Sequence, residues 1–541
     1  MSNNELISNK PNRTILEYAV VAAFFCGAIA IAPVDKAELG AMTAIPSLFM
    51  LVFIFATKRI LEGLTLGSLL ALFMTYKGEF LAKAVANVSG TVAGDDAPWL
   101  FTQWIFTFCG IGDEGARGLF TVGTYVETSI SGIIGETSKT LTAVMLDEGT
   151  QWLFIVCGLM GSILTLIERS GGADAFGKWV AKRAKTRTST LMWTWVLGLI
   201  IFIDDYLNSL TVGSTMAPIT DKHKVSREKL AYIIDSTAAP VCVLIPISTW
   251  AVFIAGRLED AGAVAPGEGM QFFIKTIPYN LYAWIAVFIV PLVILKIIPD
   301  FGPMKEAERR AREDGIMAPP GSSKMDVHSS EEFTLPANPR ILNFVLPIAV
   351  LVASTVYFDI DMQPGVLFTL AFMFLLYIPQ GIVSPQGFCD AAVAGVKTML
   401  LPLLIVVLAF VFANVNEQMG FLTYMIETAS EHVTPEYLPV VCFVVLGITE
   451  FIIGLNWGMY AVAIPVVIPL AAEIGADPYI AVGAVCSAGV WGSHICFYSD
   501  ATVISSAGAG CDNYRHAITQ MPYGFLGAGI TAVAYLVVGH L

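Results

Sequence analysis

The chain has 541 residues, of which 56% are hydrophobic and only 14% are charged, and its formal net charge is −14. Soluble proteins carry about a quarter charged residues, so this composition excludes a soluble enzyme and a disordered chain. The negative charge and the lack of a basic patch with interleaved aromatic residues exclude a nucleic-acid binder. Apolar runs of roughly 18 or more residues recur along the chain, and each is long enough to cross the hydrocarbon core of a bilayer. The sequence therefore predicts an all-α polytopic membrane protein whose partner is the lipid bilayer.

The apolar runs give about 11 expected transmembrane helices. The first follows Lys10 and Arg13 in the manner of a signal peptide, but its length and the spans after it favour a retained first helix. The predicted spans are 14–32, 41–57, 60–76, 150–168, 228–254, 272–298, 341–357, 366–382, 398–415, 478–505 and 522–540.

Two further apolar segments, 190–221 and 440–474, do not fit single helices. Each is roughly 30 residues long and has polar residues and glycines at its centre: FIDDYLNSLTVG at 202–213 and TEFIIGLNWGMY at 449–460. Irregular backbone at membrane depth is tolerated only where it packs in protein or lines a wet cavity. We therefore expect two re-entrant hairpins, each with two short helical arms and a polar tip.

Basic residues orient the two hairpins. Lysine and arginine flank the first hairpin on both sides, so it should open to the cytoplasm. None occurs between Lys397 and Arg515, and the second hairpin has acidic flanks, so it should open to the outside. Hairpins that open to opposite faces imply an inverted repeat. A weak echo between 236–252 and 486–503 agrees with this. The N-terminus should be cytoplasmic and the C-terminus outside.

The expected domain organisation follows from the repeat. The segment 1–40 holds a tail and an extra first helix, and 41–298 forms the first repeat, with an acidic outside insertion at 77–148. A cytoplasmic linker at 299–340 contains ERRAREDG, which we expect to be a solvated helix, and 341–541 forms the second, inverted repeat. The segment 173–186 is expected to be an amphipathic interfacial helix.

Nine cysteines are scattered, with no CxxC spacing, and most lie in apolar runs, so we expect buried inert thiols and no Cys/His metal site. No cofactor is expected beyond Na⁺ and H⁺ as transported or coupling ions.

Charged and titratable residues predicted to lie near the middle of the membrane are the main indication of function. They are costly in hydrocarbon, and none has a lysine or arginine as an evident sequence neighbour. They are Glu168, Asp204, Asp205, Asp235, Glu450, His494 and Asp500. The alternative is that each acid is protonated or caps a hairpin arm. His494 either titrates or is a hydrogen-bonded packing residue.

The segments 230–250 and 480–506 combine acids, hydroxyls and helix breakers such as Pro240 and Gly492. A broken helix exposes carbonyl groups, and carbonyls with a carboxylate suit Na⁺. Asp235-Ser236-Thr237 and Ser499-Asp500-Ala501-Thr502 are therefore expected to form paired ion-site elements. The alternative for these hydroxyls is interhelical packing. A buried carboxylate that holds a proton or a cation, but not both, meets the requirement of an antiporter.

The run FIDDYLNSLTVGSTMAPITDKHKVSREKLAYIIDSTAAPVCVLIPISTW closely resembles the NhaC-type Na⁺/H⁺ antiporter family. So does the run from Asn456-Trp457-Gly458 through SDATVISS to His516 and TQMPY at 519–523. The resemblance covers roughly residues 150–541. It implies scaffold and transport domains, an elevator-type mechanism, a homodimer and the inner (plasma) membrane. Gly492-Ser493-His494 departs from the family pattern Gly-Asp-His, and relatives include malate/lactate exchangers and a tetracycline-efflux branch, so the cargo stays open.

The leading interpretation is a Na⁺(Li⁺)/H⁺ antiporter working by alternating access, with Asp235 and Asp500 as direct Na⁺ ligands. The expected ion- or substrate-binding residues are Asp204, Asp205, Asn208, Asp235, Ser236, Thr237, Glu450, Asn456, Trp457, His494, Ser499, Asp500 and Thr502. The alternative is a Na⁺- or H⁺-coupled transporter of a small carboxylate, amino acid or drug. Tyr206 and Tyr498 would then help to line the pocket, unless they only pack or anchor. An intramembrane protease lacks both GxGD and a separated nucleophile and base.

Overall fold

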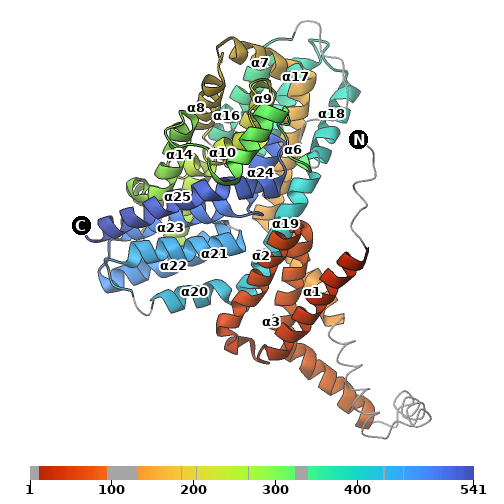
Figure 1. Ribbon diagram of the computed structural model, residues 1–541, viewed down its shortest axis with the longest axis vertical. Helices are drawn as coiled ribbons and strands as arrows, with labels where there is room; N and C mark the ends of the chain where they lie inside the picture. Colours follow the sequence, from red (N-terminus) through yellow and green to blue (C-terminus); the bar gives the residue numbers. More distant parts are fainter. Residues whose placement is uncertain are drawn as a thin grey trace, which may run out of the picture. The chain divides into compact units, whose positions relative to one another are not determined.

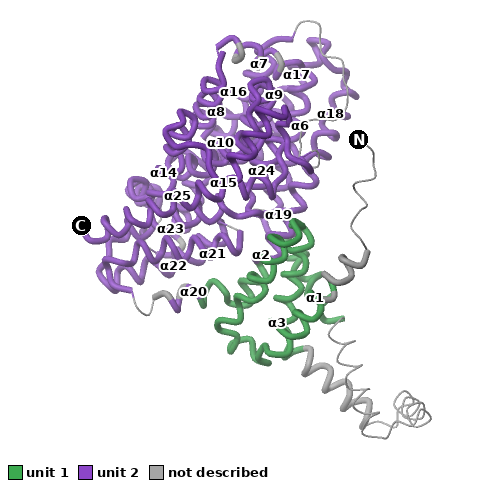
Figure 2. The backbone as a smooth tube through the Cα atoms, in the orientation of Figure 1, with its two compact units in different colours: residues 1–144, 414–424 green, residues 145–413, 425–541 purple. Residues whose placement is uncertain are grey.

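The computed structural model describes residues 11–93, 131–322 and 339–541, except positions 184, 203, 263, 266, 431, 432 and 455. Every regular element within these ranges is helical (Figure 1). The chain divides into two compact units, Met1–Val144 with Asn414–Tyr424 and Met145–Ala413 with Met425–Leu541 (Figure 2). All residues of the predicted site that the structure describes lie in the second unit.

The first unit is built from three long apolar helices and the end of a fourth. These are α1 (Pro11–Ile31), α2 (Ile45–Thr57), α3 (Ile60–Ala93) and the last residues of α19 (Leu400–Met419), with the short helices η2 (Lys36–Glu38) and η3 (Gly40–Ala44). Ser47 donates to the Asn416 side chain at 2.8 Å and ties α2 to α19. Helix α3 continues past the predicted span into the predicted insertion, whose apolar patch at 98–109 lies outside the described residues.

The first half of the second unit contains the predicted first hairpin. Its helices are α6 (Glu148–Arg169), α7 (Gly172–Arg183), α8 (Arg187–Ile200), α9 (Asp205–Lys222), α10 (Arg227–Asp235), α11 (Ala239–Cys242), α12 (Thr249–Asp260), α13 (Gly269–Thr276), η4 (Ile277–Tyr279) and α14 (Leu281–Ile294). The helix–break–helix form expected for 190–221 is confirmed by α8 and α9. Helix α7 confirms the predicted helix at 173–186: Phe176 is buried against Phe344, whereas Lys182 and Arg183 are exposed.

The second half of the second unit also contains a helix–break–helix segment. Its helices are α16 (Leu342–Tyr357), α17 (Met362–Tyr377), α18 (Pro385–Thr398), α19, α20 (Phe421–Ser430), α21 (Leu438–Ile453), α22 (Asn456–Ile474), α23 (Pro478–Ile495), α24 (Asp500–Ala509) and α25 (Asn513–Gly539). Helices α21 and α22 confirm the helix–break–helix form of 440–474, and the break falls at Gly454, which has φ +73°. Helices α18 and α20 were not predicted.

Three predicted spans are broken rather than continuous. The span 228–254 divides into α10, α11 and α12, as the proline content of 230–250 indicated. The span 478–505 divides into α23 and α24, bent by 47°, which confirms the break predicted within 480–506. The span 272–298 was expected to be one helix, and this is wrong: Asn280 separates η4 from α14, and the two parts are bent by 51°. Pro278 lacks the amide hydrogen that a continuous helix would need there.

Two glycines bring the halves of the second unit into backbone contact. A Cβ atom on Gly508 of α24 would lie 2.2 Å from the Ser209 carbonyl oxygen of α9, and one on Gly213 would lie 2.4 Å from the Gly508 carbonyl carbon. Glycine alone permits this approach. It places the middle of α9, from Ser209 to Gly213, beside the end of α24.

The linker helix at ERRAREDG is solvated along one face, where Arg309, Arg312 and Glu313 are exposed, but its other face is buried at Glu308 and Ala311. Helix α15 (Gly302–Arg309) and the π-helical turn η5 (Arg310–Asp314) lie against the beginnings of α8 and α10. Glu308 is 2% exposed, accepts from the amide and hydroxyl of Ser226, and pairs with Arg187. Burial would raise the pKa of Glu308, but the charges of Arg187 and Lys229 and the hydrogen bonds outweigh it, so this pKa lies below its ordinary value.

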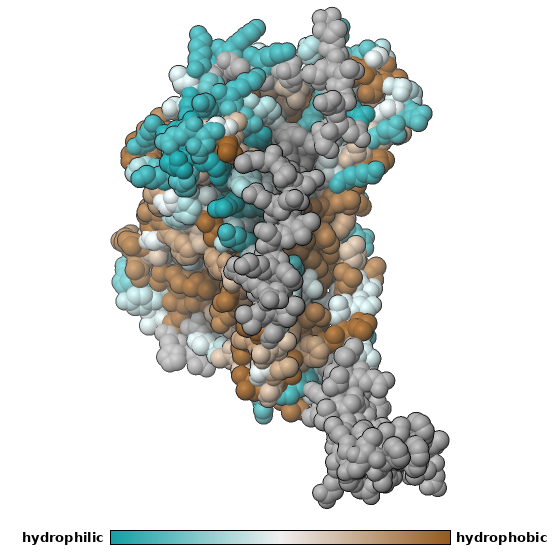
Figure 3. All heavy atoms as spheres, turned by 45° about the vertical axis from the view of Figure 1, so that its right-hand side comes forward, coloured by the Kyte–Doolittle hydropathy of each residue, from teal (hydrophilic) through white to brown (hydrophobic). Residues whose placement is uncertain are grey.

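Six helices of the described residues are long and apolar enough to cross a membrane, or eight if each bent pair is one span. Large apolar side chains such as Phe288, Leu375 and Val533 are more than half exposed, as lipid-facing residues would be. Figure 3 shows hydrophobic surface on one face of the second unit and hydrophilic side chains gathered at one end. The buried-thiol prediction holds for Cys157, Cys242, Cys442, Cys486, Cys496 and Cys511, but Cys26 and Cys389 are exposed, and Cys109 lies outside the described residues.

Candidate functional site

The tip of the first hairpin is held by Asp204. Its Oδ1 accepts from the amides of Tyr206 and Leu207 at 3.0 and 3.1 Å, which makes it the N-cap of α9. Its Oδ2 accepts from the Thr249 hydroxyl at 3.0 Å. Asp204 is 1% exposed. Its two bonds to backbone amides match the alternative considered for the intramembrane acids, in which an acid caps a hairpin arm. Asp204 nevertheless places a second carboxylate directly beside Asp205 at the tip of the hairpin.

Asp205 and Asp500 are each 1% exposed and each accept from an aromatic side chain. The Trp250 indole donates to Asp205 Oδ1 at 3.0 Å, while Asp205 Oδ2 has no hydrogen-bond partner among the described residues. The Tyr206 hydroxyl donates to Asp500 Oδ2 at 2.6 Å, which joins the first hairpin to α24. The two carboxylates thus lie at the starts of α9 and α24, which the Tyr206–Asp500 hydrogen bond joins.

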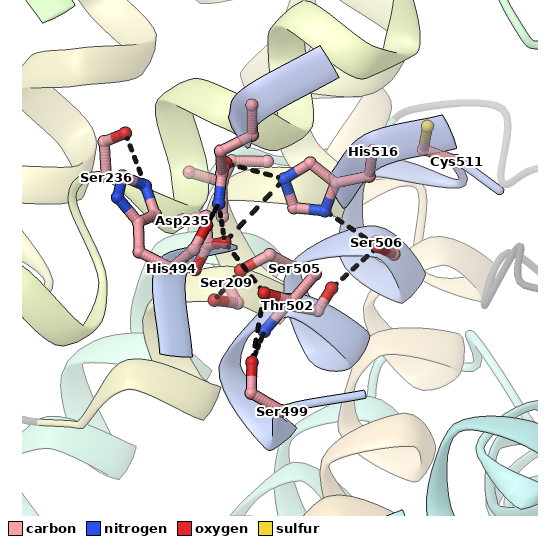
Figure 4. A network of polar contacts seen from close by, with 12 residues as sticks. Ser209, Asp235, Ser236, His494, Ser499, Thr502, Ser505, Ser506, Cys511 and His516 are labelled. Atoms are coloured by element: carbon pink, nitrogen blue, oxygen red, sulfur yellow. Dashed lines mark hydrogen bonds and ion pairs between the residues drawn. The ribbon is translucent and has the colours of Figure 1, made fainter. Parts of the chain in front are cut away.

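Asp235 lies at the last residue of α10, where the helix breaks, and is 1% exposed. Its Oδ2 accepts from the Gln520 amide at 2.5 Å and from the Thr502 hydroxyl at 3.4 Å. His516 Nε2 lies 3.8 Å from the same oxygen. Figure 4 shows Asp235, Thr502 and His516 converging from three helices.

The break between α23 and α24 supplies backbone carbonyls to the same place. Ser499 caps α24 and donates to the Ser493 carbonyl at 2.8 Å, and Thr502 donates to that carbonyl at 3.0 Å. The His494 carbonyl accepts from Gln520 Nε2 at 2.5 Å. Hydroxyls, a carboxylate and freed carbonyls therefore gather within one buried cluster, as the ion-site hypothesis for 235–237 and 499–502 requires.

His494 is hydrogen bonded on both ring nitrogens. Its Nε2 lies 3.0 Å from the Ser236 hydroxyl, and its Nδ1 lies 2.8 Å from the Tyr282 hydroxyl. Each of these hydroxyls can donate or accept a hydrogen bond, so the contacts fit the interpretation of His494 as a hydrogen-bonded packing residue. They connect α10, α14 and α23. Its side chain does not reach Asp235 directly; its backbone carbonyl is the group that lies with Gln520.

Asn208 and Thr237 fix the first hairpin against α10. Asn208 Nδ2 lies 2.7 to 2.8 Å from the carbonyls of Gly198, Ile201 and Thr237. The Thr237 hydroxyl donates back to Ile233 within its own helix. A Cβ on Gly198 would lie 2.1 Å from that hydroxyl, so the two segments are in close contact. These contacts position backbone, while Asn208 Oδ1 has no hydrogen-bond partner among the described residues.

The second hairpin holds polar atoms that find no partner among the described residues. Both carboxylate oxygens of Glu450 and both the oxygen and nitrogen of the Asn456 amide are in this state, and each residue is 0% exposed. Trp457 is half-buried between Trp250 and Phe253, with ring centroids 5.0 and 4.5 Å away, and its side chain also bonds to Asp500. The second hairpin is thereby joined to α12 and α24.

No lysine or arginine pairs with Asp204, Asp205, Asp235, Glu450 or Asp500 in the part of the chain that the structure describes. Their hydrogen-bond donors among the described residues are hydroxyls, amides and indoles, and His516 Nε2 lies 3.8 Å from Asp235. Glu168, by contrast, lies one residue before the end of α6 and is half-buried. Among the described residues no three His, Cys, Asp or Glu side chains form a metal cluster. The carboxylates are thus spread over several neighbouring positions.

Several residues of the cluster were missed from the sequence. Gln520, His516 and Ser506 connect to Asp235, and His516 Nδ1 lies 2.8 Å from the Ser506 hydroxyl. Trp250 and Tyr282 contact Asp205 and His494. The signal that could have found two of them is the spacing of His516 and Gln520, which places two polar side chains on one face of an apolar helix.

The broken helices and buried carboxylates of an all-helical, membrane-spanning chain define a multi-pass membrane transporter. A family model described as the Na⁺/H⁺ antiporter family matches residues 241–540, and the chain belongs to that family. The match begins after the first hairpin, so Asp204, Asp205 and Asp235 lie outside it.

Two individual proteins are similar to this chain. An uncharacterized protein of Haemophilus influenzae is 29% identical over 415 residues, which is 70% of this chain and 77% of the relative. A solved structure of Neisseria gonorrhoeae MtrF, described as illuminating a class of antimetabolite efflux pumps, covers 75% of this chain and 84% of its own. Its sequence identity to this chain is 12%, and the TM-score is 0.34.

Proposed function

We propose that this protein is a Na⁺(Li⁺)/H⁺ antiporter in which buried carboxylates bind the cation and the proton competitively. The observation that carries the proposal is the set of acids from both halves, each at most 1% exposed, without a lysine or arginine partner among the described residues. An unpaired charge in a dry interior is too costly to persist. Each acid therefore needs a proton or a cation, and exchange of one for the other is the antiport step.

Asp235 and Asp500 are the proposed Na⁺ ligands. Asp235 Oδ2, Thr502 Oγ1 and the carbonyls of Ser493 and His494 form an oxygen-rich cluster at two helix breaks. Hard cations prefer such oxygen ligands, and broken helices supply them without a metal cluster of the Cys/His kind. Asp500 lies at the start of α24, one residue after the Ser499 cap, so it stands beside this cluster.

The test is cation-driven proton movement in proteoliposomes. Purified protein is reconstituted with an internal pH dye and an imposed proton gradient. Addition of Na⁺ or Li⁺ should dissipate the gradient, whereas K⁺ at equal ionic strength should not. A chain that responds to none of these cations would contradict the proposal.

A coupled transporter of a small organic solute is the second candidate, and one observation favours it. The Asn456 amide has neither its oxygen nor its nitrogen paired within the described residues. A cation would satisfy the oxygen but not the N–H donor, whereas a solute that carries both a donor and an acceptor group would satisfy both. Stabilisation of purified protein by a carboxylate, amino acid or drug only when Na⁺ is present would favour this candidate.

The proposed mechanism is alternating access by an elevator-type movement of a transport domain that carries both hairpins, within an inverted-repeat homodimer of the plasma membrane. Two helix–break–helix elements in two halves of the chain support the repeat. The clustering of basic residues around the first hairpin supports a cytoplasmic N-terminus and an outside C-terminus. Labelling of single cysteines at 10 and 541 from each side of intact cells would test this orientation.

A further inference from the structure

Gln520 occupies the centre of the oxygen cluster. It lies on α25, is 0% exposed, and its Nε2 lies 2.5 Å from both Asp235 Oδ2 and the His494 carbonyl oxygen. Its Oε1 accepts from His516 Nε2 at 2.9 Å. The reversed amide would set Oε1 against two other oxygens, so the surrounding groups fix its orientation. The amide nitrogen is therefore held as a double donor between two oxygens.

The two oxygens that Gln520 bridges belong to the two breaks of the site. Asp235 ends α10, and His494 is in the last turn of α23, where a helix leaves its carbonyls without intrahelical partners. A carboxylate and a freed carbonyl are the ligands proposed above for the cation. The NH₂ group of Gln520 thus lies where a cation's positive charge would be placed.

We propose that Gln520 is a positioning residue that stands in for the cation in the ion-free protein. Its NH₂ group keeps the Asp235 carboxylate and the His494 carbonyl at the spacing that the cation uses, and the side chain turns away when the cation enters. This inference rests on the proposed function. It adds a side chain that holds the Asp235 carboxyl and the His494 carbonyl in place while no cation is bound.

The proposal predicts that two transport constants fall together when the Gln520 donor is removed. Without the NH₂ donor, the Asp235 carboxyl and the His494 carbonyl lose their shared hydrogen-bond donor in the ion-free protein, so the cation-bound protein becomes relatively more stable. The Na⁺ concentration for half-maximal exchange should fall by about fivefold or more, the worth of about one hydrogen bond. The maximal rate of Na⁺/H⁺ exchange should fall, because cation release becomes slower. Na⁺/Na⁺ exchange at saturating Na⁺, which never leaves the site empty, should be affected least.

The variants are Gln520→Met, which keeps the volume and removes the donor, and Gln520→Glu, which replaces NH₂ by oxygen but keeps an acceptor for His516. The matched control is Gln380→Met, because Gln380 also donates two hydrogen bonds, to Asn343 and Leu376, outside the site. Each variant is assayed in proteoliposomes and by thermal stabilisation of detergent-purified protein with NaCl.

Lower half-maximal Na⁺ with a lower maximal rate in Gln520→Met, and not in the control, supports the proposal; Gln520→Glu adds a charge that itself attracts the cation, so only its maximal rate is compared. A lowered rate with an unchanged or raised half-maximal concentration shows a merely structural role and overturns it. A wild-type protein that Na⁺ and Li⁺ neither stabilise nor drive overturns the proposed function and this inference together. A wild type that responds while both Gln520 variants behave like Gln380→Met overturns this inference alone.

Discussion

Replacement of Asp235 by asparagine removes one buried negative charge with almost no change in shape. Asparagine can point its oxygen at the Gln520 donor and its NH₂ group at the Ser505 hydroxyl, which also bonds to Asp235. Both groups remain paired, so the structural cost is that of one exchanged hydrogen bond, about 1 kcal/mol. The variant should therefore fold, and its thermal unfolding should change by only a few degrees.

The functional cost of Asp235→Asn is much larger. Two unit charges about 4 Å apart interact by about 4 kcal/mol at an effective dielectric constant of about 20. A loss of about 4 kcal/mol corresponds to about a thousandfold weaker cation binding. The same change removes a proton-binding group, so position 235 can bind neither the cation nor the proton.

The assay is dissipation of a proton gradient by Na⁺ in proteoliposomes, over Na⁺ concentrations that span three decades. Asp390→Asn is the control, because Asp390 is exposed on α18. We expect the control to exchange normally and Asp235→Asn to show no exchange at any concentration used. Normal exchange by Asp235→Asn would remove Asp235 from the mechanism and refute the reasoning.

Three further predictions concern contacts that hold the site together. Tyr206→Phe removes the hydroxyl that donates to Asp500 and should weaken ²²Na⁺ uptake about tenfold, the worth of a hydrogen bond to a charged group, with unfolding unchanged. Gly508→Ala forces a Cβ onto a backbone carbonyl and should destabilise by about 1–3 kcal/mol in thermal unfolding, whereas Gly529→Ala, which meets nothing, should not. Because the folded pKa of Glu308 lies below its ordinary value of 4.5, its pairing stabilises the protein above about pH 4.5, and this stability is lost as the pH falls through the folded pKa. Glu308→Gln should cost about 3 kcal/mol at pH 7 and flatten the acid limb of the stability curve; an unchanged limb would contradict this.

Local chemistry made the hairpin tips and helix breaks predictable. Asp204 precedes a run of helix-forming residues, and Pro240 and Pro246 lie within an apolar run, so a cap and a break follow from the side chains themselves. The acid at each break was found for the same reason: a carboxylate in an apolar segment is costly wherever its partners lie.

Contacts between distant segments could not be predicted in the same way. Gln520 reaches Asp235 across 285 residues, and nothing near either residue specifies that pairing. Glu308 reads as part of a solvated charge run, yet Ser226 and Arg187 bury it by supplying donors from other helices. In both cases the missing information is which helices pack together, and glycine contacts such as Gly213 with Gly508 decide that.

The partners of the carboxylates divide them by role. Asp204 has three donors, two of them backbone amides of the helix it caps, so its removal would disturb the hairpin as well as any ion. Glu450 has no donor among the described residues, and Asp205 has one for its two oxygens. Since a buried oxygen without a donor is most in need of a proton or a cation, Glu450 and Asp205 are expected to add exchangeable charge beside the proposed ligands Asp235 and Asp500. Asp204 shapes the place where that exchange occurs.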